Sequence, residues 1–224
     1  MSPAGPTAPR GQPADPATWI HLVRHATVHN PRGVFYGRLP GFGLSEAGRA
    51  QAREAARALE ELPLAAVYAS PRLRARQTAR EIARGHPGLT VRVSSLLDEV
   101  LTPFQGRPLA ELHAAGEDVY AGAGPGFEQP GDVAERMGRF LRRMCRRHPG
   151  GHVAAVTHGD PIVWAVIAGF GGRLDPKRKA RLQPYGIRDG YPAPASVTTL
   201  RIREPWGPDG LEVAYQPTGE RIGV

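Results

Sequence analysis

The repeated alternation of short apolar runs with longer segments of helical periodicity constrains the fold of this chain more than any other feature. Runs typical of buried strands occupy residues 19–23, 65–70, 90–94, 152–156, 196–202 and 211–215. Helical segments occupy residues 46–62, 72–84, 132–147 and 160–168, and Ser45 is placed to cap the first of them. Strands that alternate with helices pair mostly in parallel. The sequence therefore predicts an α/β protein, a three-layer α/β/α sandwich with a mostly parallel central sheet.

Two segments lie outside this alternation. Residues 1–17 contain five prolines and almost no large apolar side chain, so we expect a disordered tail rich in Pro and Ala. Residues 100–131 end in a stretch rich in Gly and Pro, from 116 to 131, which is long enough to form a small cap or lid. The remaining length, residues 18–224, suits a single domain that carries this cap segment.

The composition of the chain limits the classes of partner and the cellular location that we expect. The chain has 29 basic and 21 acidic residues, a net charge of +8, and all its basic residues except Lys177 and Lys179 are arginines. The arginines are scattered and not interleaved with aromatic residues, so we expect anionic small molecules as partners and no nucleic acid. The longest apolar run, residues 162–170, is far shorter than the ~20 residues that span a bilayer, so we expect no membrane association. Cys145 is the only cysteine, which excludes an intramolecular disulfide and favours a cytoplasmic location.

Polar residues follow four of the predicted strands at the point where each strand ends. In chain order these residues are Arg24 and His25, Ser70 and Arg74, Asp98 and Glu99, and finally Thr157, His158 and Gly159. Ligands of open α/β sheets bind beyond the carboxyl ends of the strands. We therefore expect two histidines, two arginines and an acid to meet at one edge of the sheet.

Ordered blocks around these residues resemble a known family. The blocks are Leu22-Val23-Arg24-His25-Ala26, Leu44-Ser45-Glu46-Ala47-Gly48, Ser70-Pro71-Arg72-Leu73-Arg74, Leu97-Asp98-Glu99 and Val156-Thr157-His158-Gly159. They are similar to the motifs of the histidine phosphatase superfamily, the phosphoglycerate-mutase-like proteins, and the resemblance extends from about residue 19 to residue 202. It departs at Ala26, where glycine is commoner in the family. The resemblance implies a phosphoglycerate-mutase-like fold and phosphoryl chemistry through a phosphohistidine intermediate.

The resemblance also implies a role for each of these residues. The catalytic set is His25 as nucleophile, Glu99 as general acid and base with Asp98 as its competitor, and Arg24, Arg74 and His158. The substrate-binding set is Arg24, Asn30, Arg38, Arg74, His158 and Gly159. Arginine forks suit phosphate oxygens and stay charged. The Arg24 cation disfavours the imidazolium form of His25, which must keep a lone pair to attack phosphorus.

This chemistry requires neither a metal nor a cofactor, because it rests on positioning and electrostatics. A zinc site is the alternative, since His21, His25 and His29 are spaced to lie on one face of a helix. The segment is predicted to be a strand, on which His21 and His25 lie too far apart to chelate one ion easily. We therefore expect no metal site.

The interval between Glu99 and His158 indicates which reaction of the family to expect. It spans 158 − 99 = 59 positions, whereas the cofactor-dependent phosphoglycerate mutases that resemble this chain carry a longer insertion there. A short insertion predicts an open pocket in which water reaches the phosphohistidine. We expect a metal-independent phosphomonoesterase acting on a small phosphorylated metabolite. A phosphoglycerate mutase, an α-ribazole-phosphate-type phosphatase and a non-catalytic phosphate-binding or interaction module are the alternatives, and the sequence assigns neither substrate nor oligomeric state.

Overall fold

A computed structural model describes residues 17–203 and 207–222, so the predicted tail at residues 1–17 lies outside the described residues except for Ala17, which is buried. Six strands form one sheet in the order β3-β2-β4-β1-β5-β6. Their bounds are β1 (Thr18–Arg24), β2 (Leu64–Ala69), β3 (Val91–Val93), β4 (His152–Thr157), β5 (Val197–Ile202) and β6 (Leu211–Gln216). Strands β1 to β4 run parallel to one another, whereas β5 pairs antiparallel with β1, and β6 pairs antiparallel with β5 at the edge of the sheet. The predicted mostly parallel sheet is confirmed.

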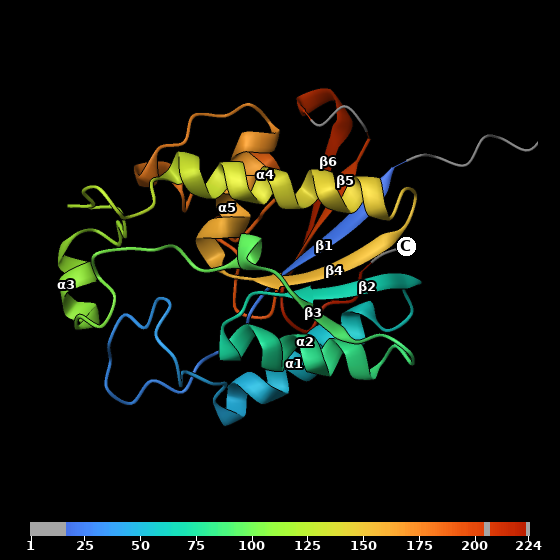
Figure 1. The fold of residues 1–224 in the computed structure, drawn as a ribbon, viewed down its shortest axis with the longest axis horizontal. Coiled ribbons are helices and arrows are strands. Elements are labelled where there is room, and N and C mark those ends of the chain that lie inside the picture. Colours follow the sequence, from blue (N-terminus) through green and yellow to red (C-terminus); the bar gives the residue numbers. More distant parts are fainter. Residues whose placement is uncertain (1–16, 204–206, 223–224) are drawn as a thin grey trace, which may run out of the picture.

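Helices cover both faces of this sheet, which makes the predicted three layers (Figure 1). Helices α1 (Glu46–Leu59) and α2 (Leu73–Arg84) cover one face, and α4 (Pro130–Arg147) and α5 (Gly159–Gly169) cover the other. Side chains alternate between the two faces along a strand. In β1, Ile20 and Leu22 accordingly join the core under α4 and α5, while Val23 joins the core under α1 and α2.

The first turn of α1 supports the segment that follows β1. Ser45 caps the helix as expected, because its hydroxyl oxygen accepts a hydrogen bond from the Gly48 N–H at 3.0 Å. A Cβ atom at Gly48 would lie 1.9 Å from the Thr27 carbonyl oxygen. Only glycine therefore allows the helix to approach so closely. The helix ends at Leu59, three residues before the predicted end, and the chain turns towards β2.

Residues 100–131 extend beyond the carboxyl ends of β1 and β4, beside the segment of residues 26–44 (Figure 1). They contain a short helix, α3 (Leu109–Ala114), which the sequence pattern did not predict. Two backbone hydrogen bonds of 2.8 Å join the two segments, from Phe35 N–H to Arg107 O and from Leu109 N–H to Gly33 O. Helix α4 begins two residues before its predicted start, because a capping box between Gln129 and Asp132 closes its first turn.

Among residues 17–203 and 207–222, no helix is both long enough and apolar enough to cross a membrane.

Candidate active site

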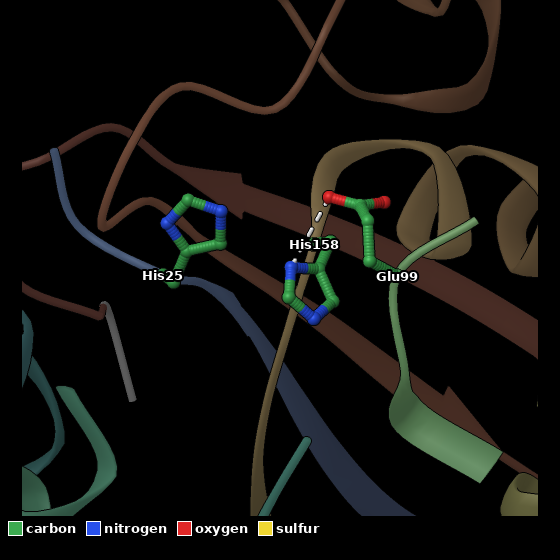
Figure 2. A group of neighbouring side chains, drawn as sticks. All are labelled: His25, Glu99 and His158. Carbon is green, nitrogen blue, oxygen red and sulfur yellow. Dashed lines mark ion pairs between the residues drawn. The ribbon is translucent and has the colours of Figure 1, made fainter. Parts of the chain in front are cut away.

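The pairing of β1 with β4 brings the two predicted site histidines together. Arg24, the last residue of β1, pairs with Thr157, the last residue of β4, so the next residues of both strands leave the sheet side by side. The His25 N–H donates to Thr157 O at 2.9 Å. The rings of His25 and His158 lie with their centroids 5.1 Å apart, and Figure 2 shows them with Glu99 around one space.

His25 is held as a neutral imidazole with one nitrogen free to react. Its Nδ1 lies 2.8 Å from the Ala26 carbonyl oxygen, and since a carbonyl only accepts, Nδ1 carries the proton. Nε2 therefore keeps its lone pair. The ring is 4% exposed. Burial, followed by the charges of Arg74, His158 and Arg24, lowers the pKa of His25 well below its usual value.

His158 lies at the centre of a hydrogen-bonded group. Its Nε2 is 2.8 Å from the Ser70 hydroxyl oxygen, and its Nδ1 is 3.2 Å from Glu99 Oε2. Arg74 Nη2 lies 3.1 Å from the same Nδ1. Burial is the main cause that lowers the pKa of His158 to about 4, against the opposing effect of Glu99. The ring is therefore neutral at pH 7 and fixed in orientation.

The two predicted arginines face this group with donors to spare. Arg74 is fully buried, donates from Nη2 to Gly37 O at 2.9 Å and stacks on Tyr36. Its Nε and Nη1 have no hydrogen-bond partner among the described residues. Arg24 donates from Nη1 to Pro192 O at 2.7 Å and lies over the Tyr191 ring. Buried N–H groups without partners are costly, so these guanidiniums suit an anion with several acceptor oxygens.

The two acids that the sequence left in competition point to different partners. The carboxylate of Asp98 is engaged by Arg72, with Nη2–Oδ2 at 2.9 Å and Nε–Oδ1 at 2.8 Å. It also accepts from Ser70 Oγ at 3.3 Å. The carboxylate of Glu99 instead faces His158 and Arg74, and lines the cavity. The geometry favours Glu99 as the acid that meets a substrate.

Glu99 is ionised in this arrangement. Burial by itself would raise the pKa of its carboxyl, but His158 and Arg74 outweigh burial and hold the pKa well below its usual value. The Val100 N–H adds a hydrogen bond of 2.9 Å to Glu99 Oε1. His158 and Arg74 are also the groups that a bound anion would contact, so anion binding would weaken their interaction with the Glu99 carboxylate.

The other three of the six predicted substrate-binding residues, Asn30, Arg38 and Gly159, occupy different places. Gly159 lines the cavity at the first turn of α5, and a Cβ atom there would lie 2.2 Å from the Tyr191 hydroxyl oxygen. Asn30 closes its own loop, with Nδ2 donating to Val34 O at 2.9 Å. Arg38 donates from Nε to the Glu99 carbonyl oxygen at 2.7 Å. Of these three, the structure brings only Gly159 to the cavity wall.

The cavity beside His25 has a volume of about 390 Å³ and two kinds of wall. Its apolar wall comes from α3, from the residues that flank this helix and from the loop before α1, and its residues are Phe35, Val100, Leu109, Leu112 and Val119. Its polar wall holds Asp160, Lys179 and Tyr191, with the Tyr191 hydroxyl donating to Asp160 at 2.6 Å. Sequence reasoning missed this polar wall. Asp160, directly after His158-Gly159, was the one signal that pointed to it.

His25, Glu99 and His158 also form the one group of possible metal ligands among the described residues, with ligand atoms within 4.8 Å of one another. The Arg74 cation lies 3.1 Å from His158 Nδ1 and 3.4 Å from Glu99 Oε2. A divalent cation there would lie beside a buried guanidinium, so the donor set suits an anion better. His21 is buried against Thr199, and His29 is exposed, so the three histidines spaced four apart do not converge.

Comparisons with known proteins show which family and fold this chain is similar to. The profile of the histidine phosphatase superfamily (branch 1) matches residues 20–189. An uncharacterized protein of Mycobacterium tuberculosis is 38% identical over 72% of this chain and 84% of its own length. Fructose-2,6-bisphosphatase TIGAR B of Danio rerio is 31% identical over 70% of this chain and 66% of its own length. The structure of mycobacterial glucosyl-3-phosphoglycerate phosphatase superposes with a TM-score of 0.71 at 24% identity, covering 91% of this chain and 100% of that one.

Proposed function

Given that the chain belongs to the histidine phosphatase superfamily, we propose that it is a metal-independent phosphomonoesterase working through a phosphohistidine on His25. The observation that carries the proposal is the pairing of a nucleophile with an anion site. His25 Nε2 keeps a lone pair because Nδ1 is committed to Ala26 O, and Arg74 offers buried N–H groups without partners beside it. A phosphate monoester, with about two negative charges near pH 7, is the ligand that such donors suit.

In the first step, His25 Nε2 attacks phosphorus while the ester P–O bond breaks. Arg24, Arg74 and His158 hold the oxygens of the phosphoryl group, and the two guanidiniums stabilise its charge in the transition state. The leaving alkoxide takes a proton from Glu99. In the second step, Glu99 takes a proton from water, the water oxygen bonds to phosphorus, and the P–N bond breaks to release phosphate and neutral His25.

Glu99 needs a proton before the first step, although it is ionised in the structure described here. Its carboxylate is held by Arg74 and His158, which are the groups proposed to turn to the phosphoryl oxygens. When a phosphate dianion binds, Arg74 and His158 turn to its oxygens, and its negative charge lies near the Glu99 carboxylate. Both changes raise the pKa of Glu99. Substrate binding itself thus prepares Glu99 to act as an acid.

Hydrolysis is favoured over transfer to a second substrate because the cap segment of residues 100–131 is short. Its contribution to the cavity comes from α3 and neighbouring apolar side chains, and we infer that so short a segment lets water reach the phosphohistidine. A phosphoglycerate mutase and an α-ribazole-phosphate-type phosphatase are the alternatives within this chemistry. The substrate class proposed is a small phosphorylated metabolite in the cytoplasm, with neither nucleic acid nor membrane as a partner.

The alternative of another class is a phosphate-binding or interaction module without catalysis. The measurement that separates the two is phosphate release from p-nitrophenyl phosphate in the presence of EDTA. We expect activity that persists in EDTA, disappears in His25→Ala and is retained in His29→Ala, whose exposed ring lies in the same loop. Phosphate binding without turnover would support the module, and activity that survives His25→Ala would overturn the assignment of the nucleophile.

A further inference from the structure

Two arginines hold the backbone of Glu99 while its carboxylate faces His158. Arg38 donates from Nε to the Glu99 carbonyl oxygen at 2.7 Å, and Arg136 donates to the same oxygen from Nη2 at 3.4 Å. Both guanidiniums also bind Glu128, through Arg38 Nη2–Oε2 at 2.8 Å and Arg136 Nε–Oε1 at 2.8 Å. Arg38, Arg136 and Glu128 are called the clamp below.

Glu128 is tied to the same stretch of backbone by two further hydrogen bonds. The Leu101 N–H donates to Glu128 Oε2 at 2.9 Å, and the Glu128 N–H donates to Leu101 O at 2.9 Å. The clamp therefore fixes the peptides on both sides of Val100. Its members come from two distant parts of the chain, since Arg38 lies in the loop before α1, whereas Glu128 and Arg136 lie just before and within α4.

The charges explain why Glu128 is needed. Arg136 is 6% exposed, and the side chains of Arg38 and Glu128 are also largely shielded from solvent. Two guanidiniums that converge on one carbonyl oxygen repel each other unless an anion lies between them. Glu128 supplies that anion and accepts a hydrogen bond from each. Removing one partner from a shielded ion network leaves the other charges uncompensated, so the arginines would withdraw from Glu99.

We propose that Glu128 is a positioning residue for proton transfer, acting through Arg38 and Arg136 on the peptide of Glu99. This inference rests on the proposed function, in which Glu99 gives a proton to the leaving group. It assigns the Gly- and Pro-rich stretch a second task besides bordering the cavity, because that stretch carries the residue that holds the acid in place. A displacement of the acid by about 1 Å is enough to cost a large factor in rate.

Loss of positioning has a signature that a general loss of structure lacks. A p-nitrophenolate ion leaves without a proton, whereas the more basic phenolate ion leaves faster when an acid protonates it. p-Nitrophenyl phosphate and phenyl phosphate have similar shapes and the same reacting group. A misplaced acid slows the second ester more than the first, while a damaged nucleophile or phosphate site slows both.

The experiment compares kcat and KM for the two esters in wild-type protein, Glu128→Gln and Glu111→Gln. Glu111 is the matched control, since it lies in the same segment and pairs with Arg107 on the exposed surface. For Glu128→Gln we expect kcat to fall about tenfold with phenyl phosphate and less than about threefold with p-nitrophenyl phosphate, with KM unchanged. For Glu111→Gln we expect no change with either ester. An equal loss with both esters in a folded Glu128→Gln protein would overturn the proposal.

Two more variants keep the test decisive. If Glu128→Gln does not fold, Arg38→Lys takes its place, because lysine keeps the charge but cannot reach both Glu99 O and Glu128 as the fork does. It should show the same selectivity in kcat, whereas a rise in KM alone would indicate direct substrate binding and contradict the proposal. Glu99→Gln separates the two levels of the argument. If Glu99→Gln does not slow phenyl phosphate more than p-nitrophenyl phosphate, the proposed function, in which Glu99 is the acid, is wrong. If Glu99→Gln shows this selectivity but Glu128→Gln and Arg38→Lys do not, only the role of Glu128 is wrong.

Discussion

Acid should destabilise this protein through His21, whose ring is buried in the middle of the sheet. Its Nδ1 lies 2.9 Å from Thr199 Oγ1, and its Nε2 lies 3.1 Å from Nδ1 of His152. Burial, followed by the charge of His152, lowers the pKa of His21 from 6.5 to about 3. The unfolded chain therefore binds a proton at a higher pH than the folded protein does. The contribution to stability is complete above pH 6.5 and is lost as the pH falls towards 3.

The size of the effect follows from the two pKa values. Each pH unit between them changes the free energy of unfolding by ~1.4 kcal/mol, so His21 alone accounts for about 5 kcal/mol over its whole range. Between pH 7.5 and 4.5 the loss is roughly 3 kcal/mol. In His21→Asn, the amide can bond to Thr199 but does not titrate. The variant is expected to be less stable than wild type at pH 7.5, and this deficit is expected to be roughly 3 kcal/mol smaller at pH 4.5.

Urea unfolding at pH 7.5 and 4.5, followed by the fluorescence of the buried Trp164, measures both deficits. His29→Asn is the control, because its ring is exposed and its deficit should be the same at both pH values. An equal deficit for His21→Asn at the two pH values would refute the reasoning, since the buried ring would then not be the group that binds the proton on unfolding.

Three further predictions follow from the site. In Gly159→Ala the new Cβ would lie 2.2 Å from the Tyr191 hydroxyl oxygen, so the tyrosine must move. Steady-state kinetics should show a KM about tenfold higher than that of wild type, and urea unfolding should show a loss of stability of about 1–3 kcal/mol. Arg74→Lys keeps the positive charge but loses the paired N–H donors of the guanidinium. We therefore expect kcat/KM for p-nitrophenyl phosphate to fall by about 10²–10³-fold, and an unchanged kcat/KM would contradict this prediction. NMR titration should show the His158 ring neutral down to about pH 5, because burial lowers its pKa to about 4, and should show the pKa of His25 well below its usual value for the same reason. A transition of either ring near pH 6.5 would contradict the burial described here.

The parts of the fold that local patterns determine were predicted from the sequence. Strands such as β1 and β4 are runs of buried apolar residues, and α1 starts at the cap that Ser45 provides. Helix α3 was missed because six residues are too few to show a period, and Leu112 is its only buried residue. The antiparallel pairing of β5 and β6 depends on their position at the edge of the sheet beside β1, and no local sequence pattern predicts that position.

The site shows the same division between local and tertiary information. The strand ends place His25 and His158 side by side, and their motifs identified both. The choice between Asp98 and Glu99 needed the structure, because neighbours on an extended backbone point in opposite directions. The polar wall was missed because residues such as Lys179 and Tyr191 lie beyond α5 in a segment without a repeating pattern, and they reach the cavity only in the folded protein.

The central claim is that His25 becomes phosphorylated during turnover. The most direct test mixes the protein with p-nitrophenyl phosphate, stops the reaction in alkali, in which phosphohistidine survives, and locates the phosphoryl group by mass spectrometry of the peptides. The account predicts an acid-labile phosphoryl group on His25, present in wild type and absent from His25→Ala. Phosphate released at the full rate with no phosphoryl group on His25, or with the group on another residue, would contradict it.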